Sequence, residues 1–245
     1  MTEPDDSAAR LAALESDNAR LRRLLDKVGL HDGLRHGLRD TVAMLRAVIH
    51  QSAETTENIA TYVTHLDGRL EALMRARTAI DAVGEVSLHT MVSDALQLHL
   101  VREGDGATIS GPRILLRQKA AQLMALALYE LASNAIEHGE LGGALGRVAV
   151  AWTVADGGSA EPLLTLEWKE TGATVTPPTR TGFGTRVLER TLAYELEAQT
   201  VLAYEPNGLR CTIRIPLSAR IGHVVAEAPS PLDASSPLDE LLEGP

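Results

Sequence analysis

The chain has 245 residues and a formal net charge of −10, with 33 Asp and Glu residues against 23 Lys and Arg residues. The apolar fraction of 44% is typical of a globular protein, so a wholly disordered chain or a disulfide scaffold is not expected. The negative charge argues against a broad nucleic-acid-binding surface. The single cysteine, Cys211, excludes an intramolecular disulfide and a cysteine-based zinc site, and it fits a reducing compartment.

The distribution of apolar residues does not indicate a membrane protein. No uninterrupted apolar run approaches about 18 residues, so no transmembrane helix is expected. The first residues, 1–7, are acidic and polar and do not resemble a secretory signal. We therefore expect a soluble cytoplasmic protein without membrane partners, whose core is rich in Leu, Ala and Val because only seven residues are aromatic.

A heptad pattern marks the first segment, which we predict as a coiled coil over residues 7–29. Asn18 at an a position is typical of a parallel pair whose register it fixes. Fewer than three heptads also fit a single amphipathic helix packed on its own chain, so both interpretations stay open. The a and d positions hold Leu11, Leu14, Asn18, Leu21, Leu25 and Val28.

Two longer amphipathic helices are predicted in residues 30–84. Their apolar stripes begin at Leu34 and Ile59, and the polar stretch 51–57 between them can turn the chain. This pattern predicts an αα-hairpin, and two apolar stripes on one hairpin cannot enclose a core. We therefore expect two hairpins to pair into a four-helix bundle, which makes the protein a homodimer.

The pattern changes from about Glu85 to a mixed α+β order, and we predict one domain over residues 85–218. Residues 219–245 are rich in Pro, Ser and acidic side chains, and we predict a disordered acidic tail. Its repeated SPLD motif, at 230–233 and 236–239, is either a partner-docking element or part of a weakly constrained spacer. Helices are predicted at 88–101, 120–138 and 185–196, and strands at 107–110, 114–116, 147–154, 163–169, 201–205 and 210–216.

Polar residues on the predicted helix 120–138 carry the first candidate chemistry. Glu130 and Asn134 are four residues apart and share a face. A carboxylate and an amide one turn apart, with a glycine-rich loop directly after, can hold a hydrated Mg²⁺ and phosphate oxygens. Taken alone, the same pattern also fits a solvated polar stripe.

Two further segments add to this pattern. Glu170 ends a predicted strand just before Gly172, where its carboxylate can accept a hydrogen bond from an exocyclic amine such as that of adenine. Gly182, Gly184 and Thr185 open a predicted helix, where backbone N–H groups can reach a phosphate. The three elements in this order are stronger evidence for a nucleotide site than any one of them.

These segments resemble a known family. Residues 127–141 (ALYELASNAIEHGEL) resemble the N box of the GHKL ATPase fold, 166–172 (LEWKETG) the W-x-E form of its G1 box, and 180–192 (RTGFGTRVLERTL) its G2 box. The combination is similar to the HWE group of bacterial sensor histidine kinases and their HisKA_2 relatives, over about 34–217. The resemblance implies a GHKL-type α/β sandwich that binds ATP, placed after a dimeric histidine phosphotransfer hairpin.

The resemblance also indicates the phosphoacceptor. The family's H-R-x-x-N motif matches residues 36–40, and His36 would accept the phosphoryl group. Asp40, one turn later, would fix the imidazole tautomer and leave the other ring nitrogen as the nucleophile. The family's arginine and asparagine are Gly37 and Asp40 here. The remaining candidates His50, His65, His89 and His99 have no such neighbour and are interpreted as surface or core histidines.

The resemblance implies a role for each site residue. Glu130 would act as a general base or orient the metal, Asn134 would hold Mg²⁺, and Glu170 would recognise adenine. The other nucleotide-binding residues would be Gly172, Arg180, Gly182, Gly184 and Thr185.

The predicted function is autophosphorylation of His36 from Mg-ATP and transfer to an aspartate on a response regulator receiver domain, with an upstream sensor protein as a further partner. One alternative is a histidine phosphotransfer protein with a degenerate ATPase domain, favoured by Gly37, Tyr129 and Glu137, where this chain departs from the family. A second is a regulator like the anti-sigma-factor serine kinases, which would not need His36.

Overall fold

A computed structural model of the chain describes Arg20 and residues 32–55, 58–139, 141, 146–156, 161–172, 174–178 and 181–225. The coiled coil predicted over residues 7–29 lies outside the described residues, apart from Arg20. Arg180 and both SPLD motifs also lie outside them. The chain divides into two compact units, residues 1–51 and residues 52–245.

The two predicted hairpin helices are present as α2 (Asp32–Thr55) and α3 (Ile59–Val83). Asn58 caps α3, because its side-chain oxygen accepts a hydrogen bond from the Ala60 N–H at 2.8 Å. Gly84 ends α3 with a φ of 84°, the left-handed conformation that favours glycine at this position. The pairing of two hairpins into a four-helix bundle stays a prediction.

The rest of the described chain contains two sheets and several helices. In the larger sheet the first three strands run parallel and the remaining neighbours are antiparallel. Its order is β2 (Arg102–Glu103), β3 (Gly106–Ser110), β5 (Arg147–Ala155), β6 (Leu163–Thr171), β8 (Gly208–Pro216) and β7 (Gln199–Glu205). The smaller, antiparallel sheet has the order β1 (Glu85–Ser87), β4 (Ile114–Arg117) and β9 (Gly222–Val224).

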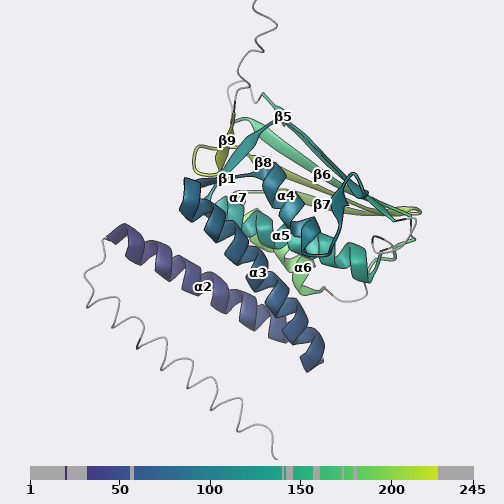
Figure 1. Cartoon of the computed structure of the whole chain (residues 1–245), viewed down its shortest axis with the longest axis horizontal. Coiled ribbons are helices and arrows are strands. Elements are labelled where there is room, and N and C mark those ends of the chain that lie inside the picture. The colour runs from purple at the N-terminus through teal and green to yellow at the C-terminus, as the bar shows by residue number, and fades with distance from the viewer. Residues whose placement is uncertain are drawn as a thin grey trace, which may run out of the picture. The chain divides into compact units, whose positions relative to one another are not determined.

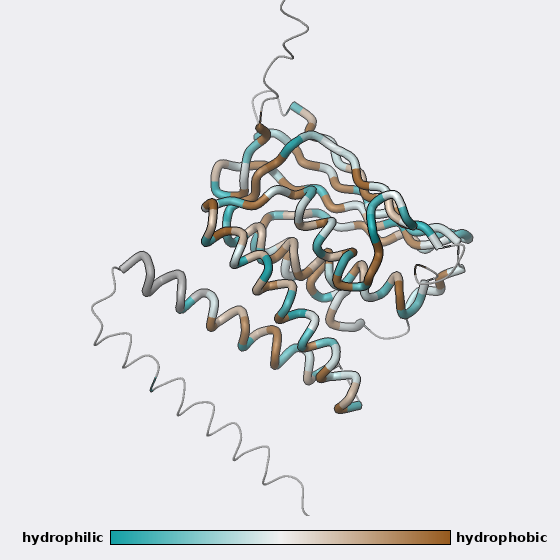
Figure 2. The backbone as a smooth tube through the Cα atoms, viewed as in Figure 1, coloured by the Kyte–Doolittle hydropathy of each residue, from teal (hydrophilic) through white to brown (hydrophobic). Residues whose placement is uncertain are grey.

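Helices cover one face of the larger sheet, as Figure 1 shows. The central one, α5, is buried along most of its length, and β5 alternates exposed with buried residues, so one sheet face packs on the helices and the other meets solvent. The same alternation of brown with paler segments is visible along the strands in Figure 2. The helices are α4 (Leu88–Gln97), α5 (Gln118–Glu137), α6 (Phe183–Arg186) and α7 (Leu192–Leu196), with a π-helical turn, Val187–Thr191, between the last two.

The predicted helices and strands of residues 85–218 are present, with local differences. Helix α4 ends before Val101 because the chain turns at residues 98–100, where Leu100 has a φ of 61°. Strands β3 and β4 are separated by only three residues but belong to different sheets. The tail was predicted to be disordered from residue 219, whereas β9 pairs with β4, so ordered structure reaches Val225. No helix among the described residues is long and apolar enough to cross a membrane.

A close approach between α3 and α5 sets their packing. A Cβ atom at Gly68 of α3 would overlap the ring and hydroxyl of Tyr129 on α5. Tyr129 is buried and also stacks on His99, with 5.5 Å between the ring centroids. Tyr129, one of the residues at which this chain departs from the family, therefore takes part in helix packing, and glycine at position 68 makes room for it.

We predict that Gly68→Ala lowers the free energy of unfolding by about 1–3 kcal/mol, because overpacking outweighs the helix propensity gained, about 1 kcal/mol. Urea denaturation followed by tryptophan fluorescence measures the change. In a Tyr129→Ala background the space is free, and Gly68→Ala should no longer destabilise. A Gly68→Ala protein as stable as the wild type would contradict this account of the contact.

Candidate functional site

An open cavity of about 1130 Å³ lies where α5, the start of α3 and residues 181–185 meet. Residues 181–185, which include the first residues of α6, are called the glycine turn below. Residues from all three sequence segments that were singled out line this one cavity. They are Glu130 and Asn134 from α5, Glu170 from β6, and Gly182, Gly184 and Thr185 from the glycine turn. Residues from three separate segments of the sequence are thus brought together, as a ligand site requires.

Glu170 and Trp168 form one unit at the inner edge of the cavity. They are two residues apart on β6 and face the same side, which is the buried side of the sheet. The Trp168 indole N–H donates a hydrogen bond to Oε1 of Glu170 at 3.0 Å. Burial raises the pKa of Glu170 to about 7, and the bond from Trp168 partly opposes this rise. The W-x-E spacing therefore places a carboxyl that titrates near neutral pH beside the cavity.

Gly172 follows directly in a conformation that suits glycine, with a φ of 107°. Its N–H donates to the backbone oxygen of Asn207 at 3.2 Å. Gly172 does not line the large cavity, and its observed role is to turn the chain after Glu170.

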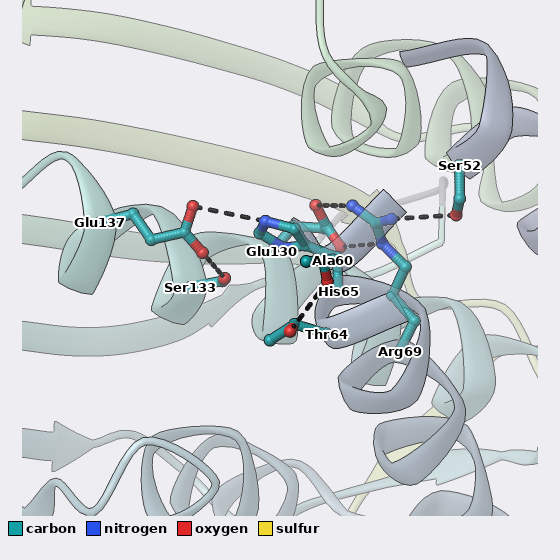
Figure 3. Close-up of polar contacts among 8 residues, drawn as sticks. All are labelled: Ser52, Ala60, Thr64, His65, Arg69, Glu130, Ser133 and Glu137. Carbon is teal, nitrogen blue, oxygen red and sulfur yellow. Dashed lines mark hydrogen bonds and ion pairs between the residues drawn. The ribbon is translucent and has the colours of Figure 1, made fainter. Parts of the chain in front are cut away.

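The second unit is a buried ion pair between α3 and α5. The Arg69 guanidinium donates to both carboxylate oxygens of Glu130, with Nε–Oε1 at 2.7 Å and Nη2–Oε2 at 3.1 Å. Each side chain is only 5% exposed. Nη1 donates to Oγ of Ser52 at 2.9 Å, and the guanidinium lies 3.8 Å from the centroid of the Phe183 ring. Figure 3 shows Arg69 reaching between Glu130 and Ser52, so one side chain joins four segments of the chain.

The glycine turn packs directly against this ion pair. A Cβ atom at Gly184 would lie 2.9 Å from Oε2 of Glu130, closer than side chains pack, so glycine is needed there. A Cβ atom at Gly182 would meet no atom within 4 Å, and the backbone at that position is open toward the cavity. Gly182 therefore leaves space beside the backbone for a ligand, and Gly184 allows the turn to pack closely against Glu130.

The last turn of α5 carries a second polar contact with α3. Oε1 of Glu137 accepts a hydrogen bond from the Ser133 hydroxyl at 2.8 Å, and its Oε2 lies 3.5 Å from Nε2 of His65 (Figure 3). No pattern in the sequence indicates a carboxylate near His65, because the contact joins residues far apart along the chain. The interpretation of His65 as a histidine without an acidic neighbour is therefore wrong. It is also wrong for His89, whose Nε2 lies 3.4 Å from Oε2 of Glu103.

The residues present fit a magnesium ion carried by a nucleotide. No group of three or more His, Cys, Asp or Glu side chains suited to a metal occurs in the part of the chain that the structure describes. Asn134 lines the cavity and offers one amide oxygen. Mg²⁺ prefers oxygen ligands, keeps waters and often takes its remaining ligands from phosphates, so a single protein ligand is sufficient.

The phosphoacceptor candidates lie elsewhere in the chain. His36 and Asp40 are both in α2 and one helical turn apart, so their Cα positions share a face. They belong to the unit of residues 1–51, separate from the unit that holds the cavity. Arg180 lies outside the described residues.

Comparisons with known proteins find histidine kinases among the proteins similar to this chain. The family described as HWE histidine kinase matches residues 33–113 of the chain. A blue-light-activated histidine kinase of Brucella anthropi is 27% identical over 219 residues, which cover 88% of this chain and 44% of that protein. Its counterpart in Brucella ovis is 26% identical over 199 residues, covering 78% and 40%. The chain thus spans less than half the length of these curated relatives.

A solved structure shares the fold. The blue-light activated histidine kinase EL346 of Erythrobacter litoralis superposes with a TM-score of 0.58 at 18% identity, covering 77% of this chain and 61% of that one. The mixed helix and sheet architecture therefore resembles that of this histidine kinase. The resemblance to HWE histidine kinases is confirmed by the family match over residues 33–113 and by the relatives that cover most of this chain.

We predict that Arg69→Met lowers the free energy of unfolding by about 3–5 kcal/mol, because it leaves the buried Glu130 carboxylate without its partner. Arg75 on the same helix is the matched control, since its pair with Glu71 is solvent-exposed. Arg75→Met should cost less than about 1 kcal/mol in the same urea titration. Equal losses of unfolding free energy in Arg69→Met and Arg75→Met would show that the buried ion pair stabilises the protein no more than the exposed one.

Glu170 generates a prediction about pH. Its pKa is about 7 in the folded protein against a usual 4.5, so the folded state binds the proton more tightly. This contribution to stability is fully present below about pH 4.5 and is lost as the pH rises through about 7. Between pH 5.5 and pH 8 the wild type should lose on the order of 2 kcal/mol that Glu170→Gln does not lose.

Urea titrations at several pH values measure this difference. Glu161→Gln, which changes an exposed glutamate outside the sheet, serves as the control and should keep the wild-type pH dependence. The assignment to Glu170 is wrong if Glu170→Gln and wild type have the same slope of unfolding free energy against pH.

Proposed function

We propose that this chain is an ATP-dependent protein-histidine kinase that phosphorylates its own His36 and passes the phosphoryl group to an aspartate on a response regulator receiver domain. One observation carries the proposal. Six residues chosen from three separate sequence boxes line a single cavity, in a chain whose residues 33–113 match HWE histidine kinases.

The adenine would lie at the Glu170 end of the cavity. Its exocyclic amine would donate a hydrogen bond to the carboxyl group, directly or through water. A small cavity of about 10 Å³ beside Glu170, lined in part by Gly139 and Gly208, supports the second route, because it has room for about one water molecule.

The phosphates would lie at the other end. Asn134 and the open backbone at Gly182 line that part of the cavity, and amide groups at such a turn bind anions well. Mg²⁺, held by Asn134 and the phosphates, would supply positive charge where negative charge develops. Little covalent work is then required of the protein, which mainly positions the reacting groups.

The reaction is an in-line displacement at the γ-phosphorus. A nitrogen of the neutral His36 imidazole forms the N–P bond while the bond from the γ-phosphorus to the bridging oxygen breaks, and ADP leaves. Asp40, one turn along α2, would orient the ring and accept its proton. Glu130 has both oxygens engaged by Arg69 in the described structure. We therefore assign Glu130 a positioning role there, and a general-base role only after it separates from Arg69.

Further parts of the proposal rest on the family resemblance. The hairpin of residues 30–84 would form a homodimer, joined by the coiled coil of residues 7–29. The signal would reach the hairpin from an upstream sensor protein, and the location would be cytoplasmic.

A second candidate function is supported by the occupied Glu130 carboxylate and by Glu137. Glu137 is an acidic side chain on the cavity wall, at a position where the family often has a basic one. Both features weaken the case for a productive ATP complex. The chain would then be a histidine phosphotransfer protein that receives the phosphoryl group from a regulator, and its ATPase domain would be degenerate.

Incubation of the purified full chain with γ-labelled ATP and Mg²⁺ tests the proposal. We predict an acid-labile, alkali-stable label on the wild type that is absent from His36→Gln, because a phosphohistidine has this stability whereas a phosphoserine is acid-stable and a phosphoaspartate is alkali-labile. Asn134→Ala should reduce the labelling rate by at least about 100-fold if Asn134 holds the metal.

The matched control is His50→Gln, since His50 is an exposed histidine of the same helix. It should label at the wild-type rate. Label that persists in His36→Gln would rule out His36 as the acceptor. No label from ATP, together with uptake of the phosphoryl group from a phosphorylated regulator, would favour the phosphotransfer protein.

A further inference from the structure

An ion pair at the rim of the cavity joins two segments that the sequence did not connect. Arg186 is the last residue of α6, two positions after the second glycine of the turn. Its Nη1 lies 2.7 Å from Oε2 of Glu54, which is in the last turn of α2. Both side chains line the cavity. A cation beside the predicted phosphate end is thus held by a carboxylate of the protein itself.

The two arginines on the cavity wall differ in how easily they can change partner. Arg69 is buried and bound to the buried Glu130, and separating them would leave two charges without water. The Arg186 and Glu54 side chains are 31% and 62% exposed. An exposed pair of this kind contributes at most about 1 kcal/mol, because water screens it.

A phosphate is a stronger partner for a guanidinium than this carboxylate. Its oxygens accept two parallel N–H bonds and its charge is larger, so the exchange from Glu54 to phosphate is favourable. The position where the family often has a basic residue is Glu137 here, so the cavity needs positive charge from elsewhere. Arg186 provides it next to the open backbone of Gly182.

We propose that Arg186 is a phosphate-binding residue of this cavity and that Glu54 holds its guanidinium in the nucleotide-free protein as an internal competitor. The inference rests on the proposed function, because it assumes that the cavity binds a nucleotide. Binding would then end a contact between the glycine turn and the last turn of α2, the helix that also contains His36. By linkage, the factor by which the Glu54 contact weakens nucleotide binding equals the factor by which a bound nucleotide weakens the Glu54 contact.

Isothermal titration of the full chain with the non-hydrolysable β,γ-imido analogue of ATP, in the presence of Mg²⁺, tests the proposal. Glu54→Gln should tighten binding by about 2- to 5-fold, the worth of an exposed pair. Arg186→Gln should weaken it by about 10-fold or more, as expected for loss of a charge-assisted contact. Adenosine lacks phosphates, so neither substitution should change its affinity.

The double variant separates this mechanism from general electrostatics. In an Arg186→Gln background, Glu54→Gln should give no tightening, because the competitor has nothing left to occupy. The inference is overturned if Glu54→Gln tightens binding equally in both backgrounds, or has no effect in the wild type. Glu71→Gln, which removes a carboxylate paired with Arg75 away from the cavity, is the matched control and should leave the affinity unchanged.

The titration also distinguishes failure of this inference from failure of the proposed function. If the wild type binds neither the analogue nor adenosine, the nucleotide site itself is wrong and this inference falls with it. If the analogue binds and its affinity is indifferent to Arg186→Gln, only the role of Arg186 is wrong. All variants are compared by circular dichroism to verify that they are folded.

Discussion

The geometry of the site depends on one buried ion pair, between Arg69 of α3 and Glu130 of α5. A charged group that is 5% exposed is stable only when it is paired and hydrogen-bonded, so each of these residues fixes the position of the other. The planar guanidinium also lies against Phe183, which a lysine would not reproduce in the same way. The ion pair thereby fixes the glycine turn against α5 and sets the wall of the cavity.

The same cluster connects the cavity with the hairpin. Ser52 and Glu54, both in the last turn of α2, each contact an arginine of the cavity wall, Arg69 and Arg186 respectively. The first contact is buried and belongs to the framework, whereas the second is exposed and is the one that we propose a phosphate replaces. Under that proposal, nucleotide binding has a direct physical route to the end of α2.

Periodicity in the sequence predicted most elements because each one has a local cause. The alternation along β5 and β6 follows directly from strand geometry. The stripe predicted for α3 is confirmed only in part, since Leu73 and Ile80 are buried whereas Ile59, where the predicted stripe begins, is 82% exposed. The sequence boxes likewise indicated residues that the fold brings to one cavity. Strand β9 was missed, because its pairing with β4 depends on tertiary contact and not on the composition of the tail.

The contacts that complete the site were also missed, because they join residues far apart in sequence. The pairs Arg69–Glu130 and His65–Glu137 link α3 to α5, and no local pattern predicts them. One signal of the contact made by Arg69 was present in the sequence. Arg69 is in phase with the buried residues Leu73, Ala76 and Ile80, and an arginine on a buried stripe requires a carboxylate partner.

The central claim is that a nucleotide binds where α5 meets the glycine turn. Hydrogen exchange of the full chain, with and without the β,γ-imido analogue of ATP and Mg²⁺, tests it most directly. The account predicts slower exchange in residues 181–186 and at the end of α5, and no change in the three-stranded sheet of β1, β4 and β9. Exchange that is unaltered in the glycine turn at saturating analogue would contradict it.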